Sequence, residues 1–139
     1  MTVEAVSSLW ETEPVGLREQ PLFLNAALRG QTTLLPRALL GALIDIEERL
    51  GRRRRVRNGP REVDLDLLGY DALAVDEPGL TLPHPRVGAR RFVLAPLAEI
   101  AADARMAPGE ATVGGLLAAL RASEAVKIYP VVGWPPPLS

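Results

Sequence analysis

Four stretches of the chain show the apolar and β-branched patterns that predict β-strands. They are residues 3–9, 22–28, 63–68 and 126–132. In residues 63–68 apolar and acidic side chains alternate strictly, which is typical of a strand with one buried face. In residues 22–28 the only polar residue is Asn25, whose amide we expect either to bond neighbouring backbone or to serve a ligand. Pro130 confines the last strand to the edge of a sheet.

Other stretches change to the helical period. Residues 36–50 predict a helix with Pro36 in its first turn, Gly51 as its stop, and one apolar face made of Leu39, Leu40, Leu43, Ile46 and Leu50. Residues 112–122 predict a second helix with Thr112 as N-cap, and its apolar face holds Val113, Leu116, Leu117 and Leu120. Residues 91–100 predict a short strand or helix. Strands and helices therefore intermix, which indicates an α/β or α+β fold with a small sheet.

The domain organisation follows from the length of the chain and from the positions of its Pro-rich stretches. A chain of 139 residues suits a single domain, which we place at residues 1–132, with a Pro-rich C-terminal tail at residues 133–139. Residues 76–88 are rich in Pro and Gly and predict a functional loop.

Glu47 and Glu48 lie in the last turn of the predicted helix, where the helix dipole disfavours anions. Such local conflicts often mark functional sites.

Charge and composition narrow the function classes. The net charge is −1, from 16 basic and 17 acidic residues, so neither nucleic acid nor a membrane surface is an expected partner. Six of the 16 basic residues fall within residues 52–61, however, and such a local cluster suits a compact polyanion. Cysteine is absent, no apolar run approaches a membrane span, and the first residues lack a signal-peptide pattern. We expect a cytoplasmic protein.

The arginine cluster precedes a pair of carboxylates. On a strand, Asp64 and Asp66 would share a face about 6–7 Å apart and, in a cleft, would repel by roughly 2–3 kcal/mol. One interpretation is an amphipathic strand with a solvated outer face. The other is a Mg²⁺ site, since oxygen ligands without cysteine favour Mg²⁺, with arginines that bind the phosphates of a nucleotide. Neither GxxxxGK[ST] nor GxGxxG occurs, so the site would not be a standard phosphate loop.

The stretch RNGPREVDLDLL at residues 57–68 resembles the signature of the 6-hydroxymethyl-7,8-dihydropterin pyrophosphokinases of folate biosynthesis. Five further stretches resemble the same family in the same order: SSLWETEPVG, QPLFLNAAL, IEERLGR, LTLPHPR and RRFVLAPLAEIA. Together they cover about three quarters of the chain. The resemblance implies a ferredoxin-like α+β fold, with an antiparallel sheet and helices packed on it. It also implies transfer of the β,γ-diphosphate of ATP to the pterin hydroxymethyl group, with release of AMP.

The resemblance assigns roles by position. Asp64 and Asp66 would hold two Mg²⁺ ions together with ATP. The catalytic loop would contribute Arg52, Arg54, Arg57 and Arg61. The nucleotide would be contacted by Glu47, Arg55, His84 and Arg90, where Arg55 stands at a position that is often Lys in the family. The pterin would be bound by Thr12, Val15 and Asn25, with Phe23 and Phe92 on either side of its ring. Without the resemblance, His84 would be interpreted as a turn residue and the two phenylalanines as core.

The chain departs from the family pattern in two places. Asn58 stands where the family has Trp. Family members also begin with a strand, a Gly-Ser-Asn loop and a helix ahead of the segment that resembles residues 3–12, so about thirty residues are expected to be missing. The true start could lie upstream, the sequence could be a fragment, or association could compensate. We expect the 139-residue chain to keep the ATP and Mg²⁺ ligands and to turn over poorly or not at all.

Two alternatives remain at the level of the sequence. A relative that only binds nucleotide or pterin would share all the ligand motifs. A ferredoxin-like RNA-binding domain could use the arginines, but the net charge of −1 and the lack of interleaved aromatic residues argue against it. The oligomeric state is not specified by any of these patterns.

Overall fold

The computed structural model describes residues 1–12, 23–51, 64–85, 87, 90–105, 111–120 and 126–137, with the backbone alone at Thr12 and Phe23. The elements follow in the order β1 (Thr2–Val6), β2 (Trp10–Thr12), β3 (Phe23–Asn25), β4 (Leu28–Gln31), α1 (Pro36–Leu50), β5 (Val75–Glu77), β6 (Leu80–Leu82), α2 (Arg91–Ala101), α3 (Val113–Ala119) and β7 (Val126–Ile128). All strand pairs are antiparallel. The predicted α+β class is therefore confirmed.

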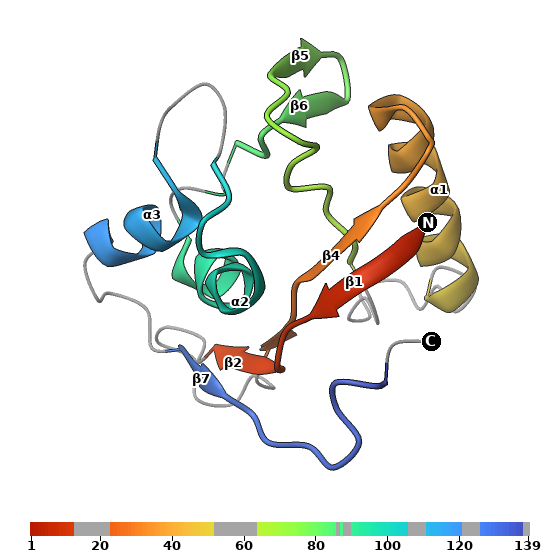
Figure 1. Ribbon diagram of the computed structural model, residues 1–139. Coiled ribbons are helices and arrows are strands. Elements are labelled where there is room, and N and C mark those ends of the chain that lie inside the picture. Colours follow the sequence, from red (N-terminus) through yellow and green to blue (C-terminus); the bar gives the residue numbers. More distant parts are fainter. Residues whose placement is uncertain are drawn as a thin grey trace.

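The first four strands form two arms of one long antiparallel ribbon (Figure 1). β1 pairs with β4, so that Thr2 faces Gln31, and β2 pairs with β3, so that Trp10 faces Asn25. The register shifts by one residue beside Gly30, where a side chain could not be placed, because a Cβ on Gly30 would lie 2.5 Å from the Thr2 carbonyl oxygen. The two strands predicted at residues 3–9 and 22–28 thus lie side by side.

Ser7 joins the two halves of this ribbon. Its amide donates to the Ala27 carbonyl at 2.8 Å, and its Oγ accepts a hydrogen bond from the Ala27 amide at 2.8 Å. Ser7 is 1% exposed, so these bonds replace ladder bonds at a buried interruption of the strands. Beyond it, β2 is flanked by β3 and β7, and β7 lies at the edge that Pro130 predicts.

The core lies between α2, α3 and the ribbon. Leu94 and Val113 have no exposed surface, and Ala27, Val87 and Leu97 pack with them. α2 contacts α3 as well as β2, β3, β4 and β7. α3 begins as predicted, because the Thr112 side chain accepts a hydrogen bond from the Gly115 amide at 3.0 Å. These contacts make α2 the central helix.

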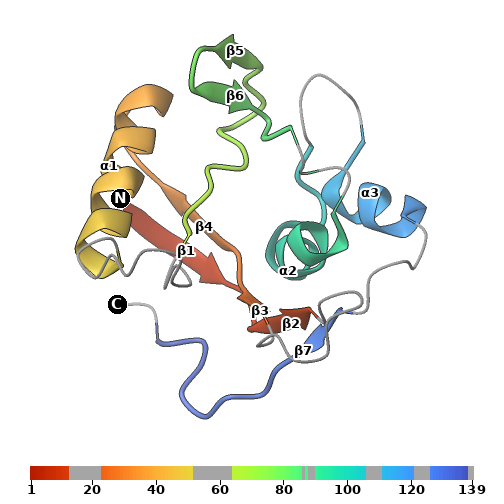
Figure 2. The ribbon, with the colours of Figure 1, turned by 180° about the vertical axis from the view of Figure 1, so that it is seen from behind.

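Helix α1 lies on the other side of the β1–β4 ribbon from α2 and α3 (Figures 1 and 2). Polar contacts connect it to the segment that follows residue 63. The Tyr70 hydroxyl donates to the Leu34 carbonyl at 2.6 Å, and Arg37 bonds the Glu77 carboxylate at 2.9 Å. Both contacts lie at the N-terminal end of α1. At its C-terminal end, the Glu47 carboxylate accepts a hydrogen bond from the Leu65 amide at 2.9 Å. The segment from Leu65 to Glu77 is therefore held to both ends of α1.

One expectation about local structure is wrong. Among the described residues 64–68 no strand forms, because alternation supplies a pattern but no hydrogen-bonded neighbour, and none of the described strands pairs here. On α1 the predicted apolar face is only partly covered: Leu39 is buried, whereas Ile46 and Leu50 are exposed. The stretch at residues 91–100, predicted as a short strand or helix, is part of helix α2. The predicted loop at residues 76–88 includes most of the β5–β6 hairpin, which spans residues 75–82 and turns at Gly79.

Candidate functional site

The two aspartates of the predicted metal site both face solvent. Along residues 64–67 exposure alternates, since Asp64 and Asp66 are exposed while Leu65 and Leu67 are half-buried. Leu68 continues into the core, where it packs against the buried cluster. The alternation predicted from the sequence is thus present in the burial of the side chains, although the strand is not.

Glu47 holds this segment from α1. Its Oε2 accepts a hydrogen bond of 2.9 Å from the amide of Leu65, the residue between the two aspartates. The Glu47 carbonyl meanwhile accepts from the Gly51 amide at 2.9 Å and closes the helix. The acidic residue that conflicts with the dipole of α1 therefore has a structural partner outside the helix.

His84 lies beside the other end of the same segment. Its amide donates a hydrogen bond of 2.8 Å to the Leu68 carbonyl, and its own carbonyl accepts from the Val87 amide at 3.0 Å. The sequence predicts that His84 contacts phosphate. Its backbone is held beside Leu68, which lies two residues after Asp66. Its side chain is half-buried.

Arg90 and Phe92 lie at the start of α2. Arg90 is the N-cap residue and is exposed, and its guanidinium carbon lies 6.0 Å from the centre of the Phe92 ring. This is the outer limit of a cation–π contact. A residue that the sequence assigns to the nucleotide and a residue that it assigns to the pterin are thus adjacent.

The other pterin-assigned residues described here lie on the β2–β3 pair. Asn25 faces Trp10, and Thr12 faces Phe23. Because opposed residues and residues two apart share a face of a sheet, these four positions lie on one face. The buried Nε1 of Trp10 has no hydrogen-bond partner within the described part of the chain. Trp10 thus shares a face with positions assigned to the pterin, although the sequence pattern assigns it no role.

Six predicted residues lie outside the described residues: Arg52, Arg54, Arg55, Arg57, Arg61 and Val15. Their roles stay predictions from the sequence.

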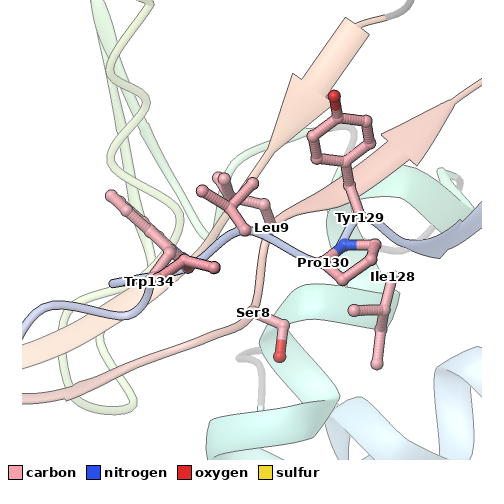
Figure 3. Close-up of a pocket in the computed structure, with 8 residues that line it drawn as sticks. Ser8, Leu9, Ile128, Tyr129, Pro130 and Trp134 are labelled. Carbon is pink, nitrogen blue, oxygen red and sulfur yellow. The ribbon is translucent and has the colours of Figure 1, made fainter.

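A pocket of about 350 Å³ lies elsewhere (Figure 3). It is lined by Ser8 and Leu9 and by the C-terminal segment at residues 128–132 and 134. The Trp134 indole donates to the Ser7 carbonyl at 3.0 Å and holds this segment in place. Among the predicted site residues that the structure describes, none lines this open, largely apolar pocket, so it is distinct from the site built from them.

The residues present fit Mg²⁺ in their chemistry. Among the described residues no group of three or more His, Cys, Asp or Glu side chains gathers. Mg²⁺ nevertheless usually binds only one or two protein carboxylates, and water and substrate phosphates complete its octahedron. Asp64 and Asp66 on an anchored segment meet that requirement. Within the same part of the chain, no helix combines the length and hydrophobicity of a bilayer span.

The structure defines an α+β protein with two exposed carboxylates on an anchored segment. Comparison with known proteins specifies the family. Residues 1–102 match the family model of 7,8-dihydro-6-hydroxymethylpterin-pyrophosphokinase (HPPK). The chain belongs to the HPPK family.

Individual relatives agree. The 2-amino-4-hydroxy-6-hydroxymethyldihydropteridine pyrophosphokinase of Bacillus subtilis is 50% identical over 100 residues, which is 72% of this chain and 60% of that protein. The enzyme of the same name from Pseudomonas aeruginosa is 45% identical over 105 residues, 76% of this chain and 65% of that one. A mitochondrial folate synthesis bifunctional protein of Arabidopsis thaliana is 47% identical over 98 residues, 70% of this chain and 18% of its own length. The chain thus spans less than two thirds of each of these relatives.

Proposed function

We propose that the protein transfers the β,γ-diphosphate of ATP to the hydroxymethyl group of 6-hydroxymethyl-7,8-dihydropterin, a step of folate biosynthesis. The family match carries this proposal, because residues 1–102 include every residue assigned to the two substrates. The names of the bacterial and plant relatives, pyrophosphokinase and folate synthesis protein, agree with it.

The proposed reaction is a displacement at the β-phosphorus. The hydroxymethyl oxygen of the pterin forms a bond to that phosphorus, and the bond from it to the oxygen shared with the α-phosphate breaks. AMP leaves with the bonding electrons, and the hydroxyl proton passes to solvent. Negative charge on the phosphate oxygens must be stabilised throughout, which is the role we assign to Arg52, Arg54, Arg57 and Arg61.

The nucleotide would be held by residues on both sides of residues 64–68. Asp64 and Asp66 would hold two Mg²⁺ ions, which neutralise phosphate charge when bound. His84, Arg90 and Arg55 would contact the triphosphate. The hydrogen bond between the His84 amide and the Leu68 carbonyl supports this grouping, because it places His84 beside the aspartate segment.

The pterin would lie against the face of β2 and β3 that carries Asn25 and Thr12, with Val15 beside them and Phe23 and Phe92 on either side of its ring. The amide of Asn25 can both donate to and accept from a heteroaromatic edge, which suits a base-like substrate. The position of Phe92 at the start of α2, beside Arg90, supports a pterin that borders the nucleotide.

A single-turnover assay tests the proposal. The protein, in excess over the pterin alcohol, is mixed with ATP and Mg²⁺, and AMP is quantified with and without the pterin. AMP that appears only with the pterin, in equal amount to the pterin diphosphate, supports the proposal even when turnover is slow. Nucleotide binding without any AMP would contradict it and favour the binding-only relative.

A further inference from the structure

We propose that Glu47 positions the Asp64–Asp66 pair through the Leu65 amide, and that it acts as a hydrogen-bond acceptor rather than by its charge on the nucleotide. This inference rests on the proposed function, since the pair is taken to bind the metal with ATP. The side chain is half-buried, and its Oε2 already accepts from Leu65 at 2.9 Å.

The segment needs such an anchor because no strand ladder holds residues 64–68 in the described structure. The Leu65 amide bonds Glu47, and the Leu68 carbonyl bonds the His84 amide, so Asp66 is bracketed on both sides. Asp64 is adjacent to the anchored amide. A fixed peptide at Leu65 limits the positions that both carboxylates can take.

Glu47 is itself rigidly placed. It lies in the last turn of α1, and its carbonyl bonds the Gly51 amide at the helix end. One residue therefore couples the end of a 15-residue helix to the backbone between two predicted metal ligands. Partners that orient ligands in this way typically change metal affinity by about 10- to 100-fold when they are removed.

The test separates the role of Glu47 as a hydrogen-bond acceptor from the effect of its negative charge. Glu47→Gln keeps a side-chain oxygen that can accept from Leu65, whereas Glu47→Ala removes it. Asp45→Ala is the matched control, because Asp45 is an exposed acid on the same helix. Two quantities are measured for each variant: hydrogen exchange of the Leu65 amide by NMR, and the Mg²⁺ concentration needed for calorimetric binding of α,β-methylene-ATP.

We expect Glu47→Ala to accelerate Leu65 exchange and to raise the Mg²⁺ requirement by about 10-fold or more. Glu47→Gln should restore both quantities to within about threefold of wild type, and Asp45→Ala should change neither. The inference would be overturned if Glu47→Gln raised the Mg²⁺ requirement as much as Glu47→Ala while its Leu65 amide stayed protected from exchange. The charge of Glu47, and not its hydrogen bond, would then be what matters. Unchanged Leu65 exchange in Glu47→Ala would also overturn it.

Failure of the proposed function has a different signature. If the wild-type chain binds the analogue with no dependence on Mg²⁺, or not at all, the metal role of Asp64 and Asp66 is wrong and the positioning role is overturned with it. If wild type shows the dependence and Glu47→Ala matches it, the positioning inference alone is wrong.

Discussion

The amide of His84 donates a hydrogen bond of 2.8 Å to the carbonyl of Leu68. This bond brings together two stretches that the sequence separates by a Tyr-containing turn and a β-hairpin. The segment that carries Asp64 and Asp66 and the segment that carries His84 therefore form one local unit. The side chain of His84 can be changed without removing this backbone bond.

We accordingly expect His84→Ala to lower kcat/KM for ATP while leaving the fold intact. A hydrogen bond to a charged group contributes about 1.5–3 kcal/mol, which corresponds to a loss of about 10- to 150-fold. Steady-state kinetics and circular dichroism measure the two effects. A normal kcat/KM in the folded variant would contradict contact between His84 and the triphosphate.

Asp64→Asn and Asp66→Asn should each reduce activity by at least about 100-fold and weaken Mg²⁺-dependent nucleotide binding, because a metal ligand is lost. Both side chains are exposed, so thermal unfolding should change little. Asp103→Asn, at another exposed acid, is the control and should behave as wild type. Near-normal rates in either site variant of a complete, active chain would show that the metal role is wrong.

Arg61→Ala should lower kcat more than it weakens ATP binding, because we assign this guanidinium to charge that develops in the transition state. Pre-steady-state rates and nucleotide titrations separate the two quantities. A change confined to ATP affinity would place Arg61 in ground-state binding instead.

Ser7→Ala should destabilise the fold by about 1–3 kcal/mol, because the buried Ala27 amide would lose its acceptor. Chemical denaturation measures the free energy of unfolding. Thr33→Ala, at an exposed position, is the control and should stay within about 0.5 kcal/mol of wild type. Equal stability of Ser7→Ala and the control would show that this bond does not join the two halves of the ribbon.

The location of the core gives a further contrast between two leucines. Leu94→Ala should cost about 2–5 kcal/mol of unfolding free energy, because Leu94 has no exposed surface. Leu50→Ala should cost less than about 1 kcal/mol, because Leu50 is 55% exposed. A comparable cost at both positions would mean that the end of α1 is covered in solution.

The sequence predicted periodic elements better than it predicted partners. Helix α1 has the predicted bounds, from Pro36 to Leu50, because Pro36 and Gly51 act locally. The strand predicted at residues 63–68 is wrong because a strand also needs a neighbour, and alternation says nothing about one. The exposure of Ile46 and Leu50 has the same origin, since a helical face is defined by period and its burial by what packs on it.

For the site, residue types and order predicted which side chains bind the substrates, and the structure added how some of these side chains are held. The conflict of Glu47 with the dipole of α1 was visible in the sequence. The hydrogen-bond partner of Glu47 could not be predicted, because the Leu65 amide is 18 residues away along the chain and is brought near only by the fold. The position of Trp10 opposite Asn25 also became visible only in the structure, because strand register depends on pairing between distant stretches.

The most direct test of the central claim is the fate of the ATP phosphates, followed by ³¹P NMR with the protein, Mg²⁺, ATP and the pterin alcohol. Diphosphate transfer predicts that the β- and γ-phosphates move together to the pterin while AMP accumulates in equal amount. Formation of ADP, or AMP that appears without the pterin, would contradict the account.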